Sequence, residues 1–246
     1  MALSDGVDVA TIETYARPTW LYRYRSLGAE RADGISRASL AKLERELNAI
    51  ERGYIYCSTF NQMNDPMEGF YRSSGRVRSH PQFDKFSERV RNEKLNLGIA
   101  SLSETWNNEL MWAHYAGGFS GLCVGYSVSS LLAGLNDQHA LARVAYGDKP
   151  YLLNLSGVRN EDERARAILT TKNLKWSYER EWRLFAAMPG LAEHGHGAVT
   201  SVFLGMRMAE ADRKIIRRRL RAAGIRVSQT LVDGYSVKQR RNTEQG

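Results

Sequence analysis

The segment Trp176–Arg183 concentrates acidic, basic and aromatic side chains in one short run, Trp-Ser-Tyr-Glu-Arg-Glu-Trp-Arg. If it enters a β-strand, Glu179, Glu181 and Arg183 share one face, because residues two apart point to the same side of a strand. Two carboxylates and a guanidinium on one face can form the wall of a reactive pocket. The alternative is a helix end with a surface ion pair between Glu179 and Arg183, worth about 0.3–0.5 kcal/mol. The density of aromatic and acidic side chains slightly favours the pocket.

A second segment, Leu21–Arg25, alternates aromatic and basic residues in the manner of a strand and places Arg23 and Arg25 on one face. Arginine suits phosphate or carboxylate groups, because its planar fork donates two parallel hydrogen bonds. The alternative is a strand edge in solvent, which is the more common position of an arginine. By itself this segment is a weak indication of an anion site.

Three further segments contain side chains that can do chemistry. His114 can act as an acid or base, although a histidine among Trp, Met and Tyr more often packs in a core. The segment Asn64–Glu68 predicts a capped turn, and its carboxylates are too few for a metal. His194 and His196 lie in a glycine-rich run without nearby partner ligands, which favours a loop over a metal site. We therefore expect no bound metal.

Composition limits the class of protein. The chain of 246 residues is 43% hydrophobic and 25% charged, which is ordinary for a globular protein. No apolar run is long enough to cross a bilayer, and residues 1–19 lack the basic start and apolar stretch of a secretory signal. Cys57 and Cys123 lie in apolar, strand-like runs typical of buried, reduced thiols. We therefore expect a cytoplasmic protein without membrane contact.

Several common catalytic motifs are absent from the sequence. It contains no P-loop, no glycine fingerprint for dinucleotides, no nucleophile elbow and no His-Glu-x-x-His helix. Nucleoside triphosphatase, Rossmann oxidoreductase, serine hydrolase and zinc protease activities therefore lose support.

The formal charge of +8 lies almost entirely near the C-terminus, where eleven Lys or Arg and four acidic residues follow from Arg207 to the end. A predicted helix over 209–223 buries Ile215, Ile216 and Leu220. Such asymmetry can mark a nucleic-acid surface. The candidate contacts are Arg213, Lys214, Arg217, Arg218 and Arg221. The alternative, an amphipathic helix whose arginines are simply solvated, is the more common case.

The elements that must position these residues alternate irregularly between helix and strand. Several links between strands are too short for a helical crossover, which predicts an α+β fold with a single mixed, largely antiparallel sheet and flanking helices. We expect this domain over 20–235, after a loose leader at 1–19 and before a basic tail at 236–246. The predicted strands cover 20–24, 54–59, 97–103, 121–127, 142–146, 182–187, 201–204 and 227–231. The predicted helices cover about 36–52, 82–94, 109–116, 161–171 and 209–223.

In this order, the motifs resemble domain-of-unknown-function family 2971, an uncharacterised and mostly bacterial family. The resemblance covers about Leu21 to Gly205 and implies no activity. The matching residues are Leu21–Ser26, Asn64–Glu68, Met111–Ala116 with Gly121, Lys172, Trp176 and Tyr178–Arg183.

A second resemblance does imply an activity. ADP-ribosyltransferases of the arginine–serine–glutamate type carry a strand arginine, a later strand beginning Ser-Thr, and a Glu-x-Glu pair. This chain has Arg23, then Ser58 and Thr59, then Glu179 and Glu181. The resemblance implies an ADP-ribosyltransferase-like fold that takes NAD as substrate and modifies a macromolecule or hydrolyses NAD. It also implies the role of a toxin, effector or antiphage factor.

The same resemblance implies residue roles. Arg23 would hold the pyrophosphate of NAD and Ser58 would brace the site, although Ser101 or Ser103 can equally claim the serine role. Glu181 would stabilise the positive transition state, and Glu179 would orient the acceptor. Arg183, beside this pair, is the third candidate catalytic residue. The further candidates for NAD contacts are Tyr22, Trp112, His114 and Tyr115.

Two other functions remain open from the sequence. The basic helix over 209–223 can make the chain a non-catalytic nucleic-acid-binding module, or the motifs can specify the fold of a scaffold protein. Convergence of Arg23, Glu179 and Glu181 in one cleft would favour a pocket, and their separation would favour a scaffold.

Overall fold

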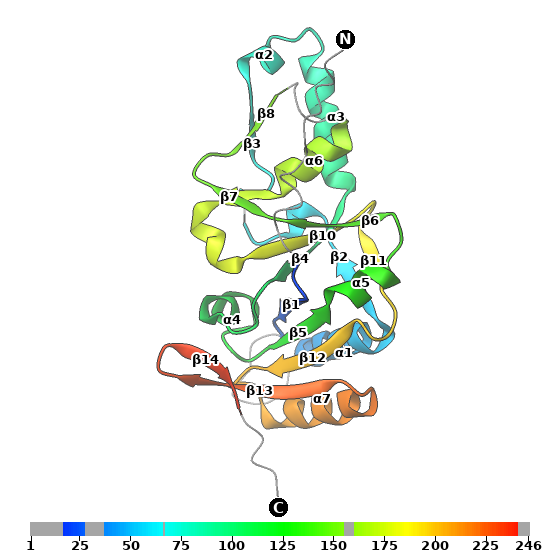
Figure 1. Ribbon diagram of the computed structural model, residues 1–246, viewed down its shortest axis with the longest axis vertical. Helices are drawn as coiled ribbons and strands as arrows, with labels where there is room; N and C mark the ends of the chain where they lie inside the picture. Colours follow the sequence, from blue (N-terminus) through cyan, green and yellow to red (C-terminus); the bar gives the residue numbers. More distant parts are fainter. Residues whose placement is uncertain (1–16, 28–36, 66, 155–159, 241–246) are drawn as a thin grey trace, which may run out of the picture.

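The computed structural model describes residues 17–27, 37–65, 67–154 and 160–240. Its main element is an eight-stranded mixed sheet with the strand order β14-β13-β12-β5-β1-β4-β10-β6 (Figure 1). Neighbouring strands run antiparallel, except that β12 and β13 are parallel. The predicted α+β class, with a mixed and mostly antiparallel sheet, is confirmed.

The strands and helices have the following bounds. The large sheet contains β1 (Trp20–Arg25), β4 (Gly98–Ser103), β5 (Leu122–Ser127), β6 (His139–Arg143), β10 (Glu181–Ala186), β12 (Val199–Leu204), β13 (Arg226–Asp233) and β14 (Ser236–Gln239). Three two-stranded sheets pair β2 (Tyr54–Cys57) with β11 (Gly190–Glu193), β3 (Tyr71–Ser73) with β8 (Tyr151–Leu153), and β7 (Ala145–Gly147) with β9 (Thr171–Asn173). The helices are α1 (Arg37–Arg52), α2 (Gly75–Arg78), α3 (Phe83–Asn96), α4 (Glu109–Tyr115), α5 (Val128–Gly134), α6 (Glu161–Leu169) and α7 (Glu210–Ala222), with 3-10 turns η1 (Phe60–Gln62) and η2 (Leu174–Glu179).

One face of the sheet packs against α1, α5 and α7 in the largest hydrophobic core. Leu43 and Leu47 of α1 and Leu220 of α7 are buried there against alternate residues of the strands, such as Leu21. The leucines of α1 recur at helical spacing, and Leu43 and Leu47 are buried while Leu40 is exposed. Gly53 ends α1 at a φ of +74°, a conformation that L residues with a Cβ avoid.

The opposite face carries two smaller cores that flank the site. On one side, Trp112 of α4 packs against Tyr24 and Phe203. On the other, Leu169 of α6 packs against Phe185 of β10. Helices α3 and α6 lie together beyond this second core, at the end of the molecule opposite α7 (Figure 1). The two cores leave the middle of this face to polar residues.

Several elements differ from their predicted bounds. The strand expected over 142–146 is divided into β6 and β7. Val144, between them, donates its N–H to the carbonyl of Glu181 at the start of β10, and Ala145 then pairs with Thr171 of β9. Residues 236–239, expected as the start of a tail, form β14, which pairs with β13. Residues 1–16 of the expected leader lie outside the described residues, and Asn108 caps the N-terminus of α4.

The sheet opens between β1 and β4. These neighbours are paired only at Tyr22 and Ser103. Beyond this pair, β1 stays hydrogen-bonded to β5, and β4 to β10. The facing edges, 23–25 and 98–102, therefore diverge. At the far end of β4, Ser58 closes the opening through a bridge to Ile99. The opening is the place where polar side chains of the second face can reach solvent.

Within the described part of the chain, no helix combines the length and apolar character needed to cross a membrane.

Candidate functional site

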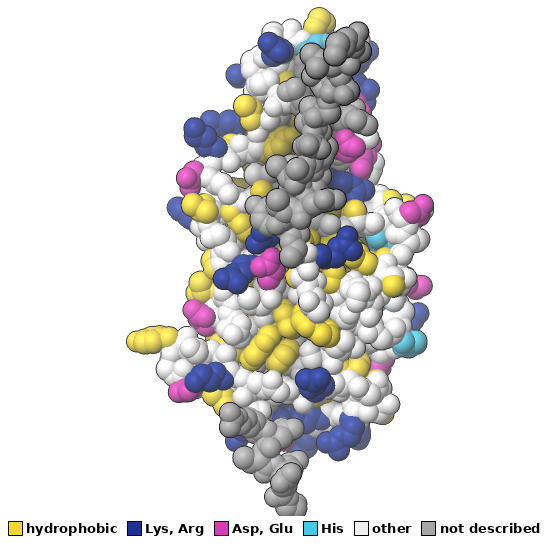
Figure 2. All heavy atoms as spheres, viewed as in Figure 1, with side chains coloured by type: hydrophobic (Ala, Val, Ile, Leu, Met, Phe, Trp, Pro, Cys, Tyr) yellow, Lys and Arg dark blue, Asp and Glu magenta, His cyan; other side chains and the backbone are white. Residues whose placement is uncertain are grey.

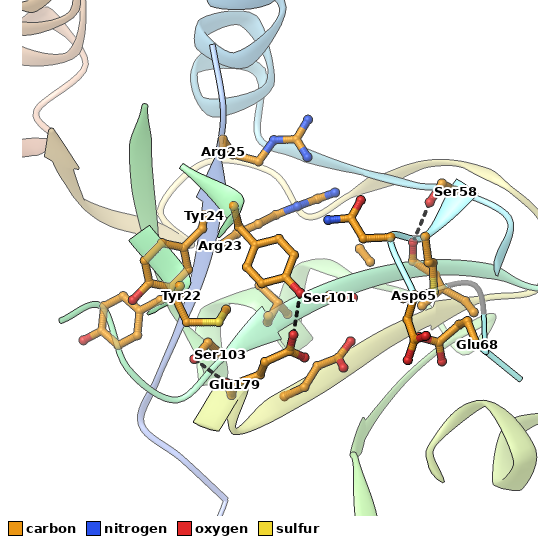
Figure 3. A pocket seen from close by; sticks show the side chains of 18 of the residues that line it. Tyr22, Arg23, Tyr24, Arg25, Ser58, Asp65, Glu68, Ser101, Ser103 and Glu179 are labelled. Atoms are coloured by element: carbon orange, nitrogen blue, oxygen red, sulfur yellow. Dashed lines mark hydrogen bonds between the residues drawn. The ribbon is translucent and has the colours of Figure 1, made fainter. Parts of the chain in front are cut away.

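A pocket of about 200 Å³ occupies the opening between β1 and β4 (Figure 3). Its lining includes most of the residues that the sequence singled out: Tyr22, Arg23, Ser58, Tyr115, Glu179 and Glu181. The structure therefore brings together residues that are up to 159 positions apart, from β1, the end of β2, α4, η2 and β10. Ser101 and Ser103, the alternatives for the serine role, line the same pocket.

The acidic wall of the pocket is a buried network of charges. Lys172 Nζ donates to Glu179 Oε2 at 2.6 Å and to Glu181 Oε2 at 3.2 Å. On the side of Glu181 away from the pocket, Arg183 donates two hydrogen bonds to this carboxylate, from Nε to Oε1 at 2.9 Å and from Nη2 to Oε2 at 3.1 Å. Arg183 Nη1 also donates to Glu68 Oε1 at 2.6 Å. Each of these side chains is at most 7% exposed, so the network carries three carboxylates against two cations almost out of contact with water.

The backbone before β10 aims Glu179 into the pocket. The prediction that Glu179, Glu181 and Arg183 share one face of a single strand is wrong in its geometry, since Glu179 ends the turn η2 and the strand begins at Glu181. Arg180 between them adopts a left-handed conformation with a φ of +44°, which brings the two carboxylates to the same side. Ser103 Oγ donates to the Glu179 carbonyl at 2.7 Å and holds this bend.

A second contact joins α4 to the same turn. Asn108, the cap of α4, accepts from the Met111 N–H and donates its amide to the carbonyl of Tyr178 at 3.0 Å. Tyr115, one turn further along α4, donates its hydroxyl to Glu179 Oε1 at 2.5 Å. The helix thereby fixes both the backbone and the carboxylate of the bend.

The two pocket carboxylates have opposite pKa shifts. Burial raises the pKa of Glu179 above its usual value, and the opposing effects of Lys172 and Tyr115 do not cancel this rise. Burial would also raise the pKa of Glu181, but the charges of Arg183 and Lys172 outweigh it and lower the pKa to about 2. Carboxylates whose environments separate their pKa values are suited to different roles. Glu181 is a permanent anion, and Glu179 is the group able to exchange a proton.

The opposite wall carries an arginine without a neutralising carboxylate. Arg23 Nη2 donates to the Tyr56 carbonyl at 3.0 Å and has no ion pair among the described residues. Arg25, which shares its face as predicted, is neutralised by two hydrogen bonds to Glu46 at 2.8 and 2.5 Å. Burial and the neighbouring Arg25 lower the pKa of Arg23, although an arginine remains charged at neutral pH. Arg23 is therefore the cation available to an anionic ligand.

Two predicted NAD contacts do not line the pocket. Trp112 is fully buried in the core and donates its indole N–H to the Trp106 carbonyl at 2.7 Å. His114 is exposed, beside Tyr115 and Tyr178. The helical rotation explains this, because α4 turns Trp112 toward the sheet and Tyr115 toward the pocket, leaving His114 outside.

Sequence reasoning missed two members of the charge network. The capped turn predicted from Asn64, Asp65 and Pro66 gives Glu68 no role, and Lys172 stands only among the family motifs. No local spacing links Glu68 to Arg183, because the two residues are 115 positions apart. The only available signal for Lys172 was its place in the ordered set of motifs.

The basic helix α7 lies at the other end of the molecule (Figure 1). Arg213 forms an ion pair with Glu210 on the same helix. The other candidates for nucleic-acid contact form no ion pair with any residue that the structure describes, and all but the half-buried Arg217 are exposed: Lys214, Arg217, Arg218 and Arg221. Arg219, which was not a candidate, is held by Glu44 and Glu51 of α1.

The remaining metal and thiol candidates are accounted for by packing. Among the residues that the structure describes, no group of three or more His, Cys, Asp or Glu is placed to hold a metal ion. His194 is buried against the Tyr126 ring. Cys57 and Cys123 are buried free thiols, as predicted.

Comparison with known proteins supports one of the two resemblances. Residues 111–184 match the model of the family described as protein of unknown function DUF2971. This stretch contains all but the first two residues of α4, Lys172 and the Glu179–Arg183 part of the charge network. Neither the comparison with curated proteins nor that with solved structures gives a match. The description of the matched family states no function, so the resemblance to ADP-ribosyltransferases rests on the residues alone.

Proposed function

We propose that the chain cleaves the nicotinamide–ribose bond of NAD, as an ADP-ribosyltransferase acting on a macromolecule or as an NAD glycohydrolase. One observation carries the proposal: Arg23, Ser58, Glu179 and Glu181 line a single pocket. Their order in the sequence is the basis of the resemblance, and their convergence is independent of that order.

The charge distribution of the pocket suits the two ends of this substrate. Arg23 offers an un-neutralised guanidinium for a pyrophosphate. Across the pocket, Glu181 is an anion held in place by Arg183 and Lys172. Cleavage of the nicotinamide–ribose bond develops positive charge on the ribose. A preorganised carboxylate in a site that excludes water stabilises such charge strongly.

Glu179 supplies the proton acceptor that the transfer requires. The bond between ribose C1′ and nicotinamide breaks, and nicotinamide leaves as a neutral molecule with the electron pair. The acceptor's N–H or O–H, or water in the glycohydrolase, forms the new bond to C1′, and its proton goes to the Glu179 carboxylate. A raised pKa makes Glu179 a better proton acceptor than an ordinary exposed carboxylate.

Release of nicotinamide from NAD by the purified chain tests the proposal. We expect Glu179→Gln and Arg23→Gln each to lower the rate by about a hundredfold, the loss typical of removing one preorganised charge. The matched control Glu193→Gln changes an exposed carboxylate of β11 outside the pocket and should leave the rate unchanged. Glu181→Gln should also be inactive, with its folding checked by thermal unfolding because Glu181 is buried. Nicotinamide release that is absent, or equal in all variants, would sink the proposal.

Nucleic-acid binding by α7 is a second candidate function. Its support is the stripe of Lys214, Arg217, Arg218 and Arg221 along one side of the helix, which no acidic residue among those described neutralises through an ion pair. Basic side chains gather at this end of the molecule in Figure 2. Affinity for DNA or RNA that falls steeply with salt, and is lost when Arg217, Arg218 and Arg221 become Ala, would support it. An absence of binding at low salt would remove it.

A further inference from the structure

A second pocket, of about 180 Å³, lies beside the first and has no role in the proposed cleavage of NAD. It forms between two small parallel sheets, one made of β7 and β9 and the other of β3 and β8. The C-terminal ends of β7 and β9 and the N-terminal ends of β3 and β8 face the pocket. Its residues come from the loop 65–72, the turn 147–150 and the segment 171–173. Figure 2 shows basic, acidic and hydrophobic side chains close together along this edge of the molecule, at the left of the view.

The two pockets share a wall. Asp65, Glu68 and Lys172 line both of them. Lys172 donates to Glu179 and Glu181 in the first pocket, so a ligand in the second pocket lies next to the charge network. The wall is held by Lys94, which is buried and donates to the Gly69 carbonyl at 2.7 Å.

The shared wall contains an unused hydrogen-bond acceptor. Glu68 is buried, and its Oε1 accepts from Arg183 while its Oε2 has no hydrogen-bond partner among the described residues. A buried carboxylate oxygen without a partner costs free energy, and such atoms are uncommon in native proteins. A hydroxyl or amino donor of a ligand would satisfy it.

The rim offers two other kinds of contact. Met67 is 72% exposed and Phe70 is 60% exposed, both unusually high values for large hydrophobic side chains at a pocket. Arg72 and Lys149 are exposed and make no ion pair within the described part of the chain. The pocket thus combines an aromatic surface, two free cations and a buried acceptor.

We propose that this second pocket binds a nucleotide, and that the nucleotide is the acceptor of the ADP-ribosyl group. A nucleobase would stack on Phe70, its phosphate would bind Arg72 and Lys149, and a sugar hydroxyl or base amino group would donate to Glu68. An acidic peptide would bring its carboxylates against Asp65, Glu68 and Asp148. A basic peptide would meet Arg72, Lys149 and Lys172. A nucleotide carries its donors and its negative charge on separate groups, as the pocket requires.

The role as acceptor rests on the proposed function, whereas the binding of a nucleotide does not. The bound acceptor's O–H or N–H would form the bond to ribose C1′ as nicotinamide leaves with its electron pair, and its proton would pass to Glu179. The acceptor can be a free mononucleotide or part of a single strand, since both present the same groups.

Direct binding tests the site without requiring catalysis. Fluorescence anisotropy would follow fluorescein-labelled single-stranded DNA and RNA decamers, with AMP as competitor, on the full chain. We expect Phe70→Ala to weaken binding by about fivefold or more, the loss typical of one base–aromatic stack. The double variant Arg72→Gln with Lys149→Gln should weaken binding. The slope of log K against log salt concentration should become shallower by about 0.7 for each lost phosphate contact. All three residues are exposed, so these variants should fold, and thermal unfolding checks this.

Two control variants separate this pocket from the rest of the surface. Arg76→Gln neutralises an exposed arginine of α2 that does not line the pocket, and it should leave binding unchanged. Neutralising Arg217, Arg218 and Arg221 of α7 tests the other basic surface. Strand binding that is lost only in the α7 variant, or that the pocket variants leave unchanged, overturns the inference, as does an absence of binding to any probe.

The remaining arms separate the possible ligands and the two proposals. Displacement of the decamer by AMP identifies the mononucleotide as sufficient, and binding of the strand alone identifies a strand as the ligand. Either outcome supports the site when the pocket variants weaken the binding of that ligand. Nicotinamide release without nucleotide binding would overturn only the inference. Nucleotide binding without nicotinamide release would overturn the proposed function, together with the acceptor role that rests on it, and would leave the nucleotide site standing.

Discussion

Arg183 of β10 and Glu68 of the 65–70 loop form a fully buried ion pair, with Arg183 Nη1 donating to Glu68 Oε1 at 2.6 Å. The same guanidinium grips Glu181 and donates to the Leu169 carbonyl at the end of α6. One side chain therefore ties the central sheet, the helical end of the molecule and the wall between the two pockets. The pair acts on the site by position, since Arg183 does not line either pocket.

Replacing Arg183 by Met should destabilise the fold severely. The substitution keeps the volume of the side chain but leaves Glu68 and Glu181 buried without their cation, which costs about 3–5 kcal/mol in comparable cases. The control Arg89→Met removes a 59% exposed arginine of α3 and should change the free energy of unfolding by about 0.5 kcal/mol or less. Urea unfolding measures both. Equal stabilities for the two variants would contradict the assigned network.

Stability should fall on acidification through the pKa of Glu181. Its pKa of about 2 lies below the usual 4.5, so its contribution is complete above the unfolded pKa and is lost as pH falls from about 5 toward 2. That contribution is on the order of 3 kcal/mol. Glu181→Gln should be less stable at pH 7 and show a shallower loss over this range. Parallel pH profiles for the variant and the parent would refute the assignment.

Lys172→Met should move the acid limb of the nicotinamide-release profile to higher pH. Lys172 opposes the burial that raises the pKa of Glu179, so removing its charge raises that pKa further. Glu179 must be ionised to accept a proton, and the rate therefore falls at a higher pH in the variant. Lys175→Met, at an exposed position of the same turn, is the control. A limb that does not move would exclude Glu179 as the titrating base.

Both thiols should be unreactive in the folded protein. Burial raises the pKa of Cys57 to about 11 and raises that of Cys123 as well, so neither forms thiolate at neutral pH. We expect a chromogenic disulfide reagent to label neither cysteine in native buffer and both in denaturant. Rapid labelling of the native chain would place a thiol at the surface, contrary to the structure.

Local pattern alone predicted much of the architecture. Aromatic and basic residues alternate along 20–24, and leucines recur at helical spacing before Gly53, so β1 and α1 could be placed without tertiary information. The three-residue strands β3, β8 and β9 were not predicted. They are too short to show a period, and only their pairing partners make them strands.

The sequence by itself determined which residue types stand in Trp176–Arg183. The order of Arg23, Ser58 and this segment along the chain marked them as a candidate site. Tertiary structure decided what they do. The bend at Arg180 placed Glu179 beside Glu181, although a strand would have been the simplest expectation. Burial and the charges of Lys172 and Arg183 then divided the roles of the two carboxylates. Burial and opposite charge act through space, across 115 positions in the case of Glu68, and no local pattern encodes them.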